Sequence, residues 1–245
     1  MAAPTLIRTD LDDGLVQIGL NNGPVNALTA PFLQDFAQLM RDMAQDPRVR
    51  SIVLSSTRPV FSAGLNLKEA QHFDAIGQAA IVDGLNTGFL ELFACPKPVV
   101  VAVDGAAIAG GLFFVLASDI RVCGRSAKFG LAEVRVGVDF PVGPMEIARA
   151  TIPPADLRRM MLTGQPVGAE HALAAGIVDV IDPDPLARAV AQARTLAQIP
   201  PKAYAAVKHQ IRAHTIAQIT ARPDPRLKHG WFTDETVPAM QKMIG

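Results

Sequence analysis

The chain has 245 residues, and its 23 Lys and Arg balance its 23 Asp and Glu, so the formal net charge at pH 7 is zero. Proteins that bind nucleic acid or anionic membranes usually carry a basic surface, so we expect neither partner. No stretch approaches the roughly 18 uninterrupted apolar residues of a membrane helix, and the first residues show no secretory pattern. We therefore expect one large cytoplasmic domain, with no membrane association.

Metal and disulfide chemistry are not expected. Cys95 and Cys123 are the only two cysteines, and their spacing matches neither a metal site nor a disulfide framework. The five histidines also lack the spacing of metal ligands. We therefore predict two reduced, packed thiols and histidines that lie on the surface or pack against neighbours.

The first part of the sequence alternates between strand and helix patterns. Runs rich in β-branched residues predict strands at 15–20, 51–56, 98–105 and 119–124. A helix is predicted between the first two strands, with Thr29 as its N-cap and apolar side chains at helical spacing, namely Phe32, Phe36, Leu39, Met40 and Met43. A second helical stretch is expected over 68–94. This alternation predicts an α/β core with parallel strands.

After residue 143 the sequence reads as a series of helices separated by Pro and Gly. The predicted helices lie at 143–152, 155–164, 169–176, 185–200 and 201–219, and only 176–182 looks extended. We predict a core over residues 1–195 and a C-terminal helical region over residues 196–245. This region contains Trp231 and Phe232, and its apolar face is expected to pack against a partner subunit.

Two glycine-containing stretches follow predicted strands. In PVFSAGLNLKEA (59–70), Gly64 permits a sharp bend or the close approach of a ligand, although for this stretch alone a simple structural turn is the favoured explanation. In DGAAIAGGLFF (104–114), Gly110 and Gly111 can form the first turn of a helix, whose free N–H groups attract negative charge. The alternative is that this Gly-Gly pair only permits close helix packing. Two such turns can converge on one oxygen and form an oxyanion hole.

Several motifs together resemble the crotonase, or enoyl-CoA hydratase/isomerase, superfamily. FSAGLNL, VDGAAIAGG and KFGLAEVRVG have its order and spacing, and GPVNAL and LTGQPVGAEHALAAGIVDVI extend the resemblance to nearly the whole chain. The resemblance implies an α/β fold, with a crotonase-like ββα spiral core and a C-terminal helical region. It also implies an enzyme that acts on an acyl-CoA thioester, needs no cofactor beyond the coenzyme A of its substrate, and assembles as a homotrimer or hexamer.

The resemblance also assigns site residues. The backbone N–H groups of Leu65 and Gly110 would form the oxyanion hole that holds the thioester oxygen. The remaining residues expected around the substrate are Ala63, Gly64, Asn66, Leu67, Lys68, Gly111, Phe113 and Asp139. Asn66 stands where many members have Asp. Arg58, Lys68 and Lys242 are candidates for contacts with coenzyme A phosphates, and otherwise ordinary solvated charges.

The reaction depends on which acids are present. Hydratases of the superfamily carry two glutamates that position water; here the first position is Phe113 and the second is Glu133. A single carboxylate in an apolar pocket suits a proton shuttle between two carbons. The chain therefore resembles the single-glutamate Δ3,Δ2-enoyl-CoA isomerases, with Glu133 as catalytic residue. The apolar side chains of Leu112, Phe113 and Phe114 would keep water away from the intermediate.

Other interpretations stay open from the sequence. A hydratase-like or decarboxylase-like enzyme can use Asp139 or a bound water in place of the missing acid, although Asp139 also fits a turn. A non-catalytic acyl-CoA-binding paralogue would keep the glycine turns without turnover. Glu133 itself can be a surface residue paired with Arg135.

Overall fold

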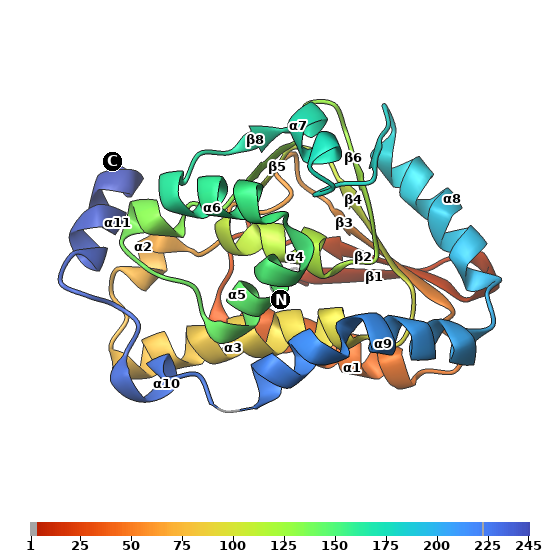
Figure 1. Ribbon diagram of the computed structural model, residues 1–245, viewed down its shortest axis with the longest axis horizontal. Coiled ribbons are helices and arrows are strands. Elements are labelled where there is room, and N and C mark those ends of the chain that lie inside the picture. The colour runs from red at the N-terminus through yellow and green to blue at the C-terminus, as the bar shows by residue number, and fades with distance from the viewer. Residues whose placement is uncertain (1–3, 222) are drawn as a thin grey trace.

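A computed structural model describes residues 4–221 and 223–245, and it contains two sheets (Figure 1). The larger has the order β1-β2-β3-β4-β6-β9, in which only β1 runs antiparallel to its neighbour. Its strands are β1 (Leu6–Asp10), β2 (Leu15–Leu20), β3 (Ser51–Ser56), β4 (Val99–Val103), β6 (Ile120–Cys123) and β9 (Val180–Ile181). The predicted α/β core with parallel strands is confirmed.

A smaller sheet, which the sequence did not predict, carries part of the site. It consists of β5 (Ala106–Ile108), β7 (Lys128–Gly130) and β8 (Val167–Gly168), with β7 in the centre. The predicted strand at 98–105 therefore ends early, and the chain turns at Gly105 into β5. Gly105 has a φ of +82°, and a Cβ there would lie 1.9 Å from the carbonyl oxygen of Pro59, so only glycine fits this turn.

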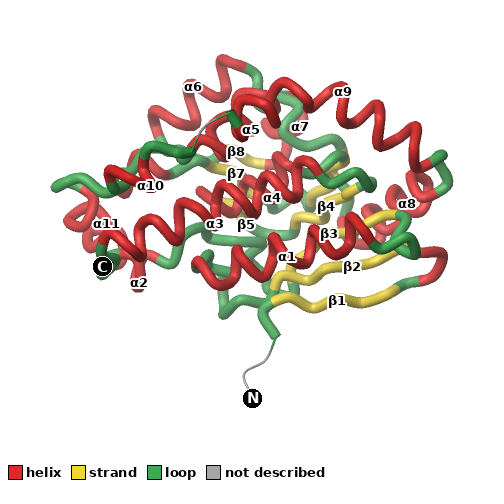
Figure 2. The backbone as a smooth tube through the Cα atoms, turned by 90° about the horizontal axis from the view of Figure 1, so that it is seen from below, coloured by secondary structure: helices red, strands yellow, loops and turns green. Residues whose placement is uncertain are grey.

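Helices cover both faces of the larger sheet (Figures 1 and 2). Side chains alternate between the faces of a strand. Val99, Val101 and Val103 accordingly belong to the main core with α1 (Ala30–Gln45) and α3 (Ala75–Ala94). Val100 and Ala102 belong to a second cluster with Ala189 and Ala193 of α8 (Pro185–Ala197).

The first helix confirms its sequence prediction. The side chain of Thr29 accepts a hydrogen bond from the N–H of Phe32, as an N-cap does. Four of the five apolar residues that were predicted from helical spacing are buried, and Leu39 is partly buried against the core. This helix packs along α3, and both lie below the larger sheet in Figure 1.

The predicted single helix at 68–94 is wrong, because the chain forms α2 (Leu67–Ala70) and α3 with a break between them. The side chain of Asp74 accepts a hydrogen bond from the N–H of Gly77 at 2.8 Å, and so starts the second helix.

The helices of the second half were largely predicted. They are α5 (Val142–Thr151), α6 (Pro154–Thr163), α7 (Ala169–Ala174), α8 and α9 (Pro201–Thr220), followed by α10 (Arg226–His229) and α11 (Thr236–Ile244). Of the extended segment predicted at 176–182, only Val180–Ile181 forms a strand. Within the ranges that the structure describes, no helix has the length and apolarity needed to cross a membrane.

The C-terminal region packs against its own chain. In α9, Lys208 and Arg212 are buried and reach the carboxylate of Asp119 at 2.7 and 2.9 Å. The same helix exposes Val207 and Ile211, at 54% and 75% of their surface. The division at residue 195 and a homotrimer or hexamer built through this region stay predictions.

Candidate active site

The first glycine bend, at residues 62–66, follows β3 and leaves the backbone N–H of Leu65 without a bond to Leu28. The N–H of Leu28 donates to the Gly64 carbonyl at 2.8 Å, and the N–H of Asn66 donates to the Leu28 carbonyl at 3.0 Å. These two bonds use the peptide groups on either side of Leu65, as in a parallel bridge. The N–H of Leu65 therefore points away from Leu28. Since Ser62 of the same bend pairs with Ala107, which leads into the second bend, we infer that this N–H points toward the second bend.

The second glycine bend, at residues 108–111, precedes α4 (Leu112–Ala117). A hydrogen bond to the first bend fixes the position of the second. The N–H of Ile108 donates to the Ser62 carbonyl at 2.9 Å. Ala109 then adopts a φ of +50°, a left-handed conformation that is uncommon for a residue with a side chain. A short 3-10 helix, Ala109–Gly111, continues into α4. N–H groups in such a first turn, Gly110 included, have no partner inside the helix.

The two bends lie against each other. A Cβ on Gly64, whose φ is +82°, would lie 2.8 Å from the Cβ of Ala109 and 3.2 Å from the nitrogen of Gly110. A Cβ on Gly111 would lie 2.5 Å from the Ser62 carbonyl oxygen. The glycines therefore permit a contact that any larger residue would push apart. Both bends can thus present an N–H to one ligand atom, which is the arrangement of an oxyanion hole.

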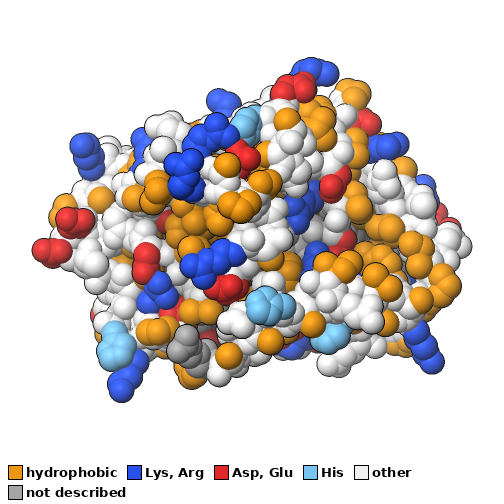
Figure 3. Space-filling view, in the orientation of Figure 1, with side chains coloured by type: hydrophobic (Ala, Val, Ile, Leu, Met, Phe, Trp, Pro, Cys, Tyr) orange, Lys and Arg blue, Asp and Glu red, His pale blue; other side chains and the backbone are white. Residues whose placement is uncertain are grey.

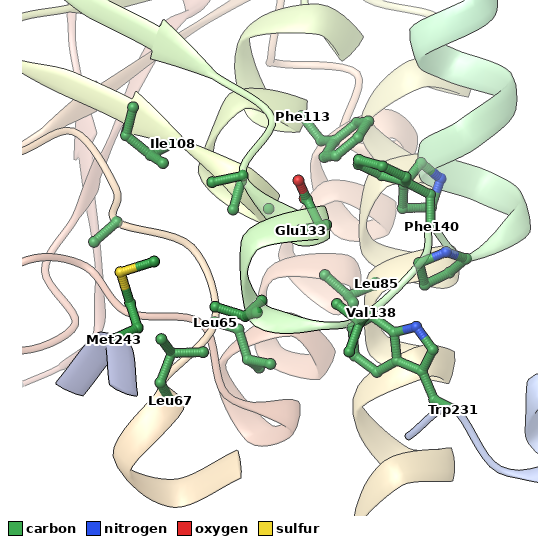
Figure 4. A pocket seen from close by; sticks show the side chains of 17 residues that line it. Leu65, Leu67, Leu85, Ile108, Phe113, Glu133, Val138, Phe140, Trp231 and Met243 are labelled. Carbon is green, nitrogen blue, oxygen red and sulfur yellow. The ribbon is translucent and has the colours of Figure 1, made fainter. Parts of the chain in front are cut away.

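A cavity of ≈ 170 Å³ opens beside the bends (Figure 4). Leu65 and Gly110 line it together with Glu133, which is the only ionisable residue among the lining residues of the described chain. The other lining residues are apolar: Ala63, Leu67, Leu85, Ile108, Ala109, Phe113, Ala132, Val136, Val138, Phe140, Pro141, Pro144, Trp231 and Met243. The site therefore combines one acid with a hydrocarbon surface.

Glu133 is buried and points into this cavity (Figure 4). It lies in a short 3-10 helix, Glu133–Val136, and is only 7% exposed. Its Oε2 atom has no hydrogen-bond partner among the described residues. Burial in apolar surroundings disfavours the charged form and raises the pKa of Glu133 to about 8. The alternative of a solvent-exposed glutamate paired with Arg135 is therefore wrong.

Phe113 occupies the position where the resemblance places the first acid of a hydratase. Its ring is 1% exposed and packs 5.5 Å from the ring of Phe89 and 6.3 Å from that of Phe140. Phe114 lies in the core, with its ring 5.0 Å from that of Phe36. Leu112 is also buried, but neither it nor Phe114 is among the cavity-lining residues of the described chain. Of the three apolar side chains expected to exclude water, Phe113 is the one in contact with the cavity.

Asp139 does not face the cavity. Its carboxylate is 67% exposed and binds Arg226 at 2.5 Å, and its Oδ1 accepts the indole N–H of Trp231 at 3.1 Å. Among the described residues, Asp139 is absent from the cavity lining. The geometry therefore does not support Asp139 as a second acid in the reaction, because its carboxylate binds Arg226 and Trp231 of the C-terminal segment.

Of the other residues expected in the site, some line the cavity and others lie outside it. Ala63 and Leu67 line the cavity. The side-chain amide of Asn66 instead donates to Glu69 at 3.3 Å, and Lys68 is exposed at the start of α2. Arg58 and Lys242 are also exposed, so each is free to meet solvent or a ligand phosphate.

Sequence reasoning missed several lining residues, above all Trp231 and Met243. Both come from the C-terminal region that was expected to serve assembly. Only the isolated tryptophan in the sequence, beside Phe232, drew attention to that segment. The sequence around Leu85 and Val138 also gave no indication that both line the cavity. Leu85 lies in α3, more than 50 residues before Val138, and only the fold brings the two together.

Comparison with known proteins places this arrangement in a family. The sequence profile of the enoyl-CoA hydratase/isomerase family matches residues 10–227. The chain is 33% identical over 204 residues to carnitinyl-CoA dehydratase of Escherichia coli strain K12, covering 81% of this chain and 77% of that protein.

Solved structures agree with the sequence match. Human mitochondrial Δ3-Δ2-enoyl-CoA isomerase is similar with a TM-score of 0.92 and 25% identity, over 98% of this chain and 97% of that one. An enoyl-CoA hydratase/isomerase from Mycobacterium paratuberculosis gives a TM-score of 0.87 at 25% identity, over 98% of both chains. The predicted crotonase fold is thus confirmed, and the protein belongs to the enoyl-CoA hydratase/isomerase family, as an enzyme that acts on acyl-CoA.

Proposed function

We propose that the protein is a Δ3,Δ2-enoyl-CoA isomerase, which moves the double bond of a 3-enoyl-CoA to the 2,3 position. The observation that carries the proposal is the single buried carboxylate of Glu133 in an otherwise apolar cavity, beside two bends that can present backbone N–H groups. The reaction needs one group that removes a proton from C2 and returns a proton to C4. One carboxylate with access to both carbons suffices.

The two bends would make C2 acidic enough to lose its proton. Removal of that proton moves negative charge onto the thioester oxygen and creates a dienolate. Under this proposal the N–H groups of Leu65 and Gly110 donate to that oxygen. Donors that are already oriented, in a cavity lined by hydrocarbon, stabilise such a charge more strongly than water does.

Glu133 would act first as base and then as acid. Its ionised carboxylate takes the proton from C2, and the resulting neutral carboxyl delivers a proton to C4. A pKa of about 8 keeps both forms accessible near neutral pH. Phe113 and Phe140 cover the cavity with aromatic surface, which favours reprotonation of the dienolate over addition of water.

Dehydration is the second candidate, because the similar Escherichia coli proteins are carnitinyl-CoA dehydratases. A dehydratase removes a C2 proton and must also assist the departure of a hydroxyl group from C3. Among the described residues, Glu133 is the one carboxylate that lines the cavity and would have to perform both tasks. Phe113, which stands where a hydratase has its other acid, cannot assist the hydroxyl group. We therefore place isomerisation ahead of dehydration or hydration.

Incubation of the purified protein with 3-hexenoyl-CoA, with crotonyl-CoA and with neither distinguishes the candidates. We expect 3-hexenoyl-CoA to become 2-hexenoyl-CoA, while crotonyl-CoA stays unhydrated over the same period, as followed by liquid chromatography. Hydration of crotonyl-CoA with 3-hexenoyl-CoA unchanged would identify a hydratase. Binding of both thioesters without any product would identify a non-catalytic acyl-CoA-binding protein.

The pH dependence of the reaction should report the buried carboxyl. Since Glu133 must be ionised to act as base, kcat/KM should rise with pH, reach half of its maximum at about pH 8 and level off above it. Initial rates at low substrate concentration between pH 6 and pH 10 measure this rise of kcat/KM, which reports the pKa in the free enzyme. A rate that is already independent of pH at pH 6 would show that a carboxyl with an ordinary pKa, or no carboxyl, is the base.

A further inference from the structure

The only tryptophan of the chain forms part of the cavity wall. Trp231 lies between α10 and α11 and is 7% exposed. Figure 4 shows its ring beyond Glu133, near Leu85 and Val138, whereas Met243 and Ile108 lie on the opposite side of the glutamate. The cavity therefore has two distinct ends on either side of the proposed base.

The two ends differ in their access to solvent. At the end without Trp231, Met243 has 44% of its surface exposed. At the Trp231 end, Leu85 and Val138 are only 5% and 8% exposed. Coenzyme A is far larger than the cavity and must leave it toward solvent, so it fits the first end. The acyl chain then extends past Glu133 toward Trp231.

The Trp231 ring is held in place at several points. The N–H groups of Trp231 and Phe232 both donate to the side-chain oxygen of Gln78 on α3, at 2.9 and 3.0 Å. The indole N–H is 3.1 Å from both the carbonyl and the Oδ1 of Asp139. These contacts fix the ring as a wall of the cavity.

A second set of bonds anchors the segment that carries this ring. Arg226 bridges the carboxylates of Asp139 and Asp224. The buried Asp224 in turn accepts hydrogen bonds from the N–H of Val142 at 2.7 Å and from the side chain of Asn86 at 3.1 Å. The segment is thus joined to α3 and to the start of α5, so a long acyl chain cannot displace the wall without breaking buried polar bonds.

We propose that Trp231 is a specificity-determining residue, which closes the far end of the acyl pocket and limits the length of the chain that it accepts. The cavity of ≈ 170 Å³ resembles in size an engineered cavity of about 150 Å³ that holds benzene, so it has room for roughly six carbons. This inference rests on the proposed function for the position of the thioester. It names short acyl chains as the substrate class.

Binding of saturated acyl-CoA thioesters tests the inference without turnover. In the wild-type protein, affinity measured by calorimetry should rise by about fourfold per methylene from butanoyl-CoA to hexanoyl-CoA and then stop rising. Decanoyl-CoA should bind no more tightly than hexanoyl-CoA. The emission of the sole tryptophan should shift with hexanoyl-CoA and stay unchanged with free coenzyme A.

Smaller residues in place of Trp231 should allow longer acyl chains to bind. In Trp231→Ala, and in Trp231→Leu as a milder change, decanoyl-CoA should bind at least about tenfold more tightly than to the wild type, because further methylenes become buried. Butanoyl-CoA should bind with unchanged affinity. Phe232→Ala is the matched control, since among the described residues Phe232 neighbours Trp231 without lining the cavity, and it should keep the wild-type length profile.

Two results would overturn the inference. One is wild-type affinity that keeps rising by the same factor per methylene up to decanoyl-CoA. The other is a length profile that is the same in Trp231→Ala and Phe232→Ala. Because saturated thioesters cannot isomerise, a protein that lacks isomerase activity yet shows the expected length limit would reject the proposed function and leave the role of Trp231 standing.

Discussion

Replacing Glu133 by Gln is expected to lower kcat for 3-enoyl-CoA isomerisation by about 100- to 10,000-fold, the usual contribution of a positioned acid or base. Glutamine has nearly the same shape but cannot take a proton from C2. The side chain is 7% exposed and one oxygen has no partner in the described chain, so an amide can occupy the site without displacing a buried ion pair. Initial rates with 3-hexenoyl-CoA measure the effect, and KM should change little.

Stability measurements separate loss of chemistry from loss of fold. The pKa of Glu133 is raised in the folded protein, so wild-type stability should fall as pH rises from the unfolded value near 4.5 to about 8. Glu133→Gln lacks this penalty and should unfold at a higher temperature than the wild type at pH 9, with a smaller difference at pH 5. Glu170→Gln, which alters a side chain that is 68% exposed, should leave both rate and stability unchanged. Undiminished turnover in Glu133→Gln would remove the proposed base.

Replacing Gly64 by Ala should lower kcat by about 100- to 1,000-fold, the cost typical of losing one oxyanion donor. The new Cβ would lie 2.9 Å from the Ile108 carbonyl oxygen and 3.2 Å from the nitrogen of Gly110. The two bends must then separate, and their N–H groups can no longer meet on one oxygen. The measurement is kcat with 3-hexenoyl-CoA, together with the affinity for a saturated acyl-CoA.

Gly176→Ala is the matched control for backbone strain. Gly176 has a φ of +69°, close to the +82° of Gly64, but no described atom lies within 4 Å of the Cβ that alanine would add. Both variants should lose stability from the left-handed conformation, and Gly64→Ala should lose more because its Cβ also meets the second bend. Only Gly64→Ala should lose activity. Equal activity in the two variants would contradict a role for the contact between the bends.

Features that depend on neighbouring residues could be predicted from the sequence. The helix after Thr29 and the strands over 15–20 and 51–56 follow from a cap, helical spacing and β-branched runs. The burial of Glu133 was expected only through the resemblance of FGLAE to a family motif, because spacing alone also fits a surface ion pair. The structure now gives the physical reason for its unusual state, which is an apolar cavity around an unpaired oxygen.

Features that depend on the return of distant segments could not be predicted. Trp231 and Met243 reach the cavity because α9 is anchored to Asp119 through Arg212 and because Asp224, after α9, is hydrogen-bonded to α3 and to the start of α5. Asp139 looked like a spare acid in the sequence, yet Arg226 from this same segment takes its carboxylate. Both outcomes depend on tertiary pairing over more than 80 residues, for which the sequence carries no local signal.

The most direct measurement follows the proton itself. 3-Hexenoyl-CoA carrying deuterium at C2 should give 2-hexenoyl-CoA with part of that deuterium at C4, as read by nuclear magnetic resonance, because one carboxyl moves it in a cavity that excludes water. Formation of 3-hydroxyhexanoyl-CoA, or a product whose C4 proton comes wholly from solvent, would contradict transfer by Glu133.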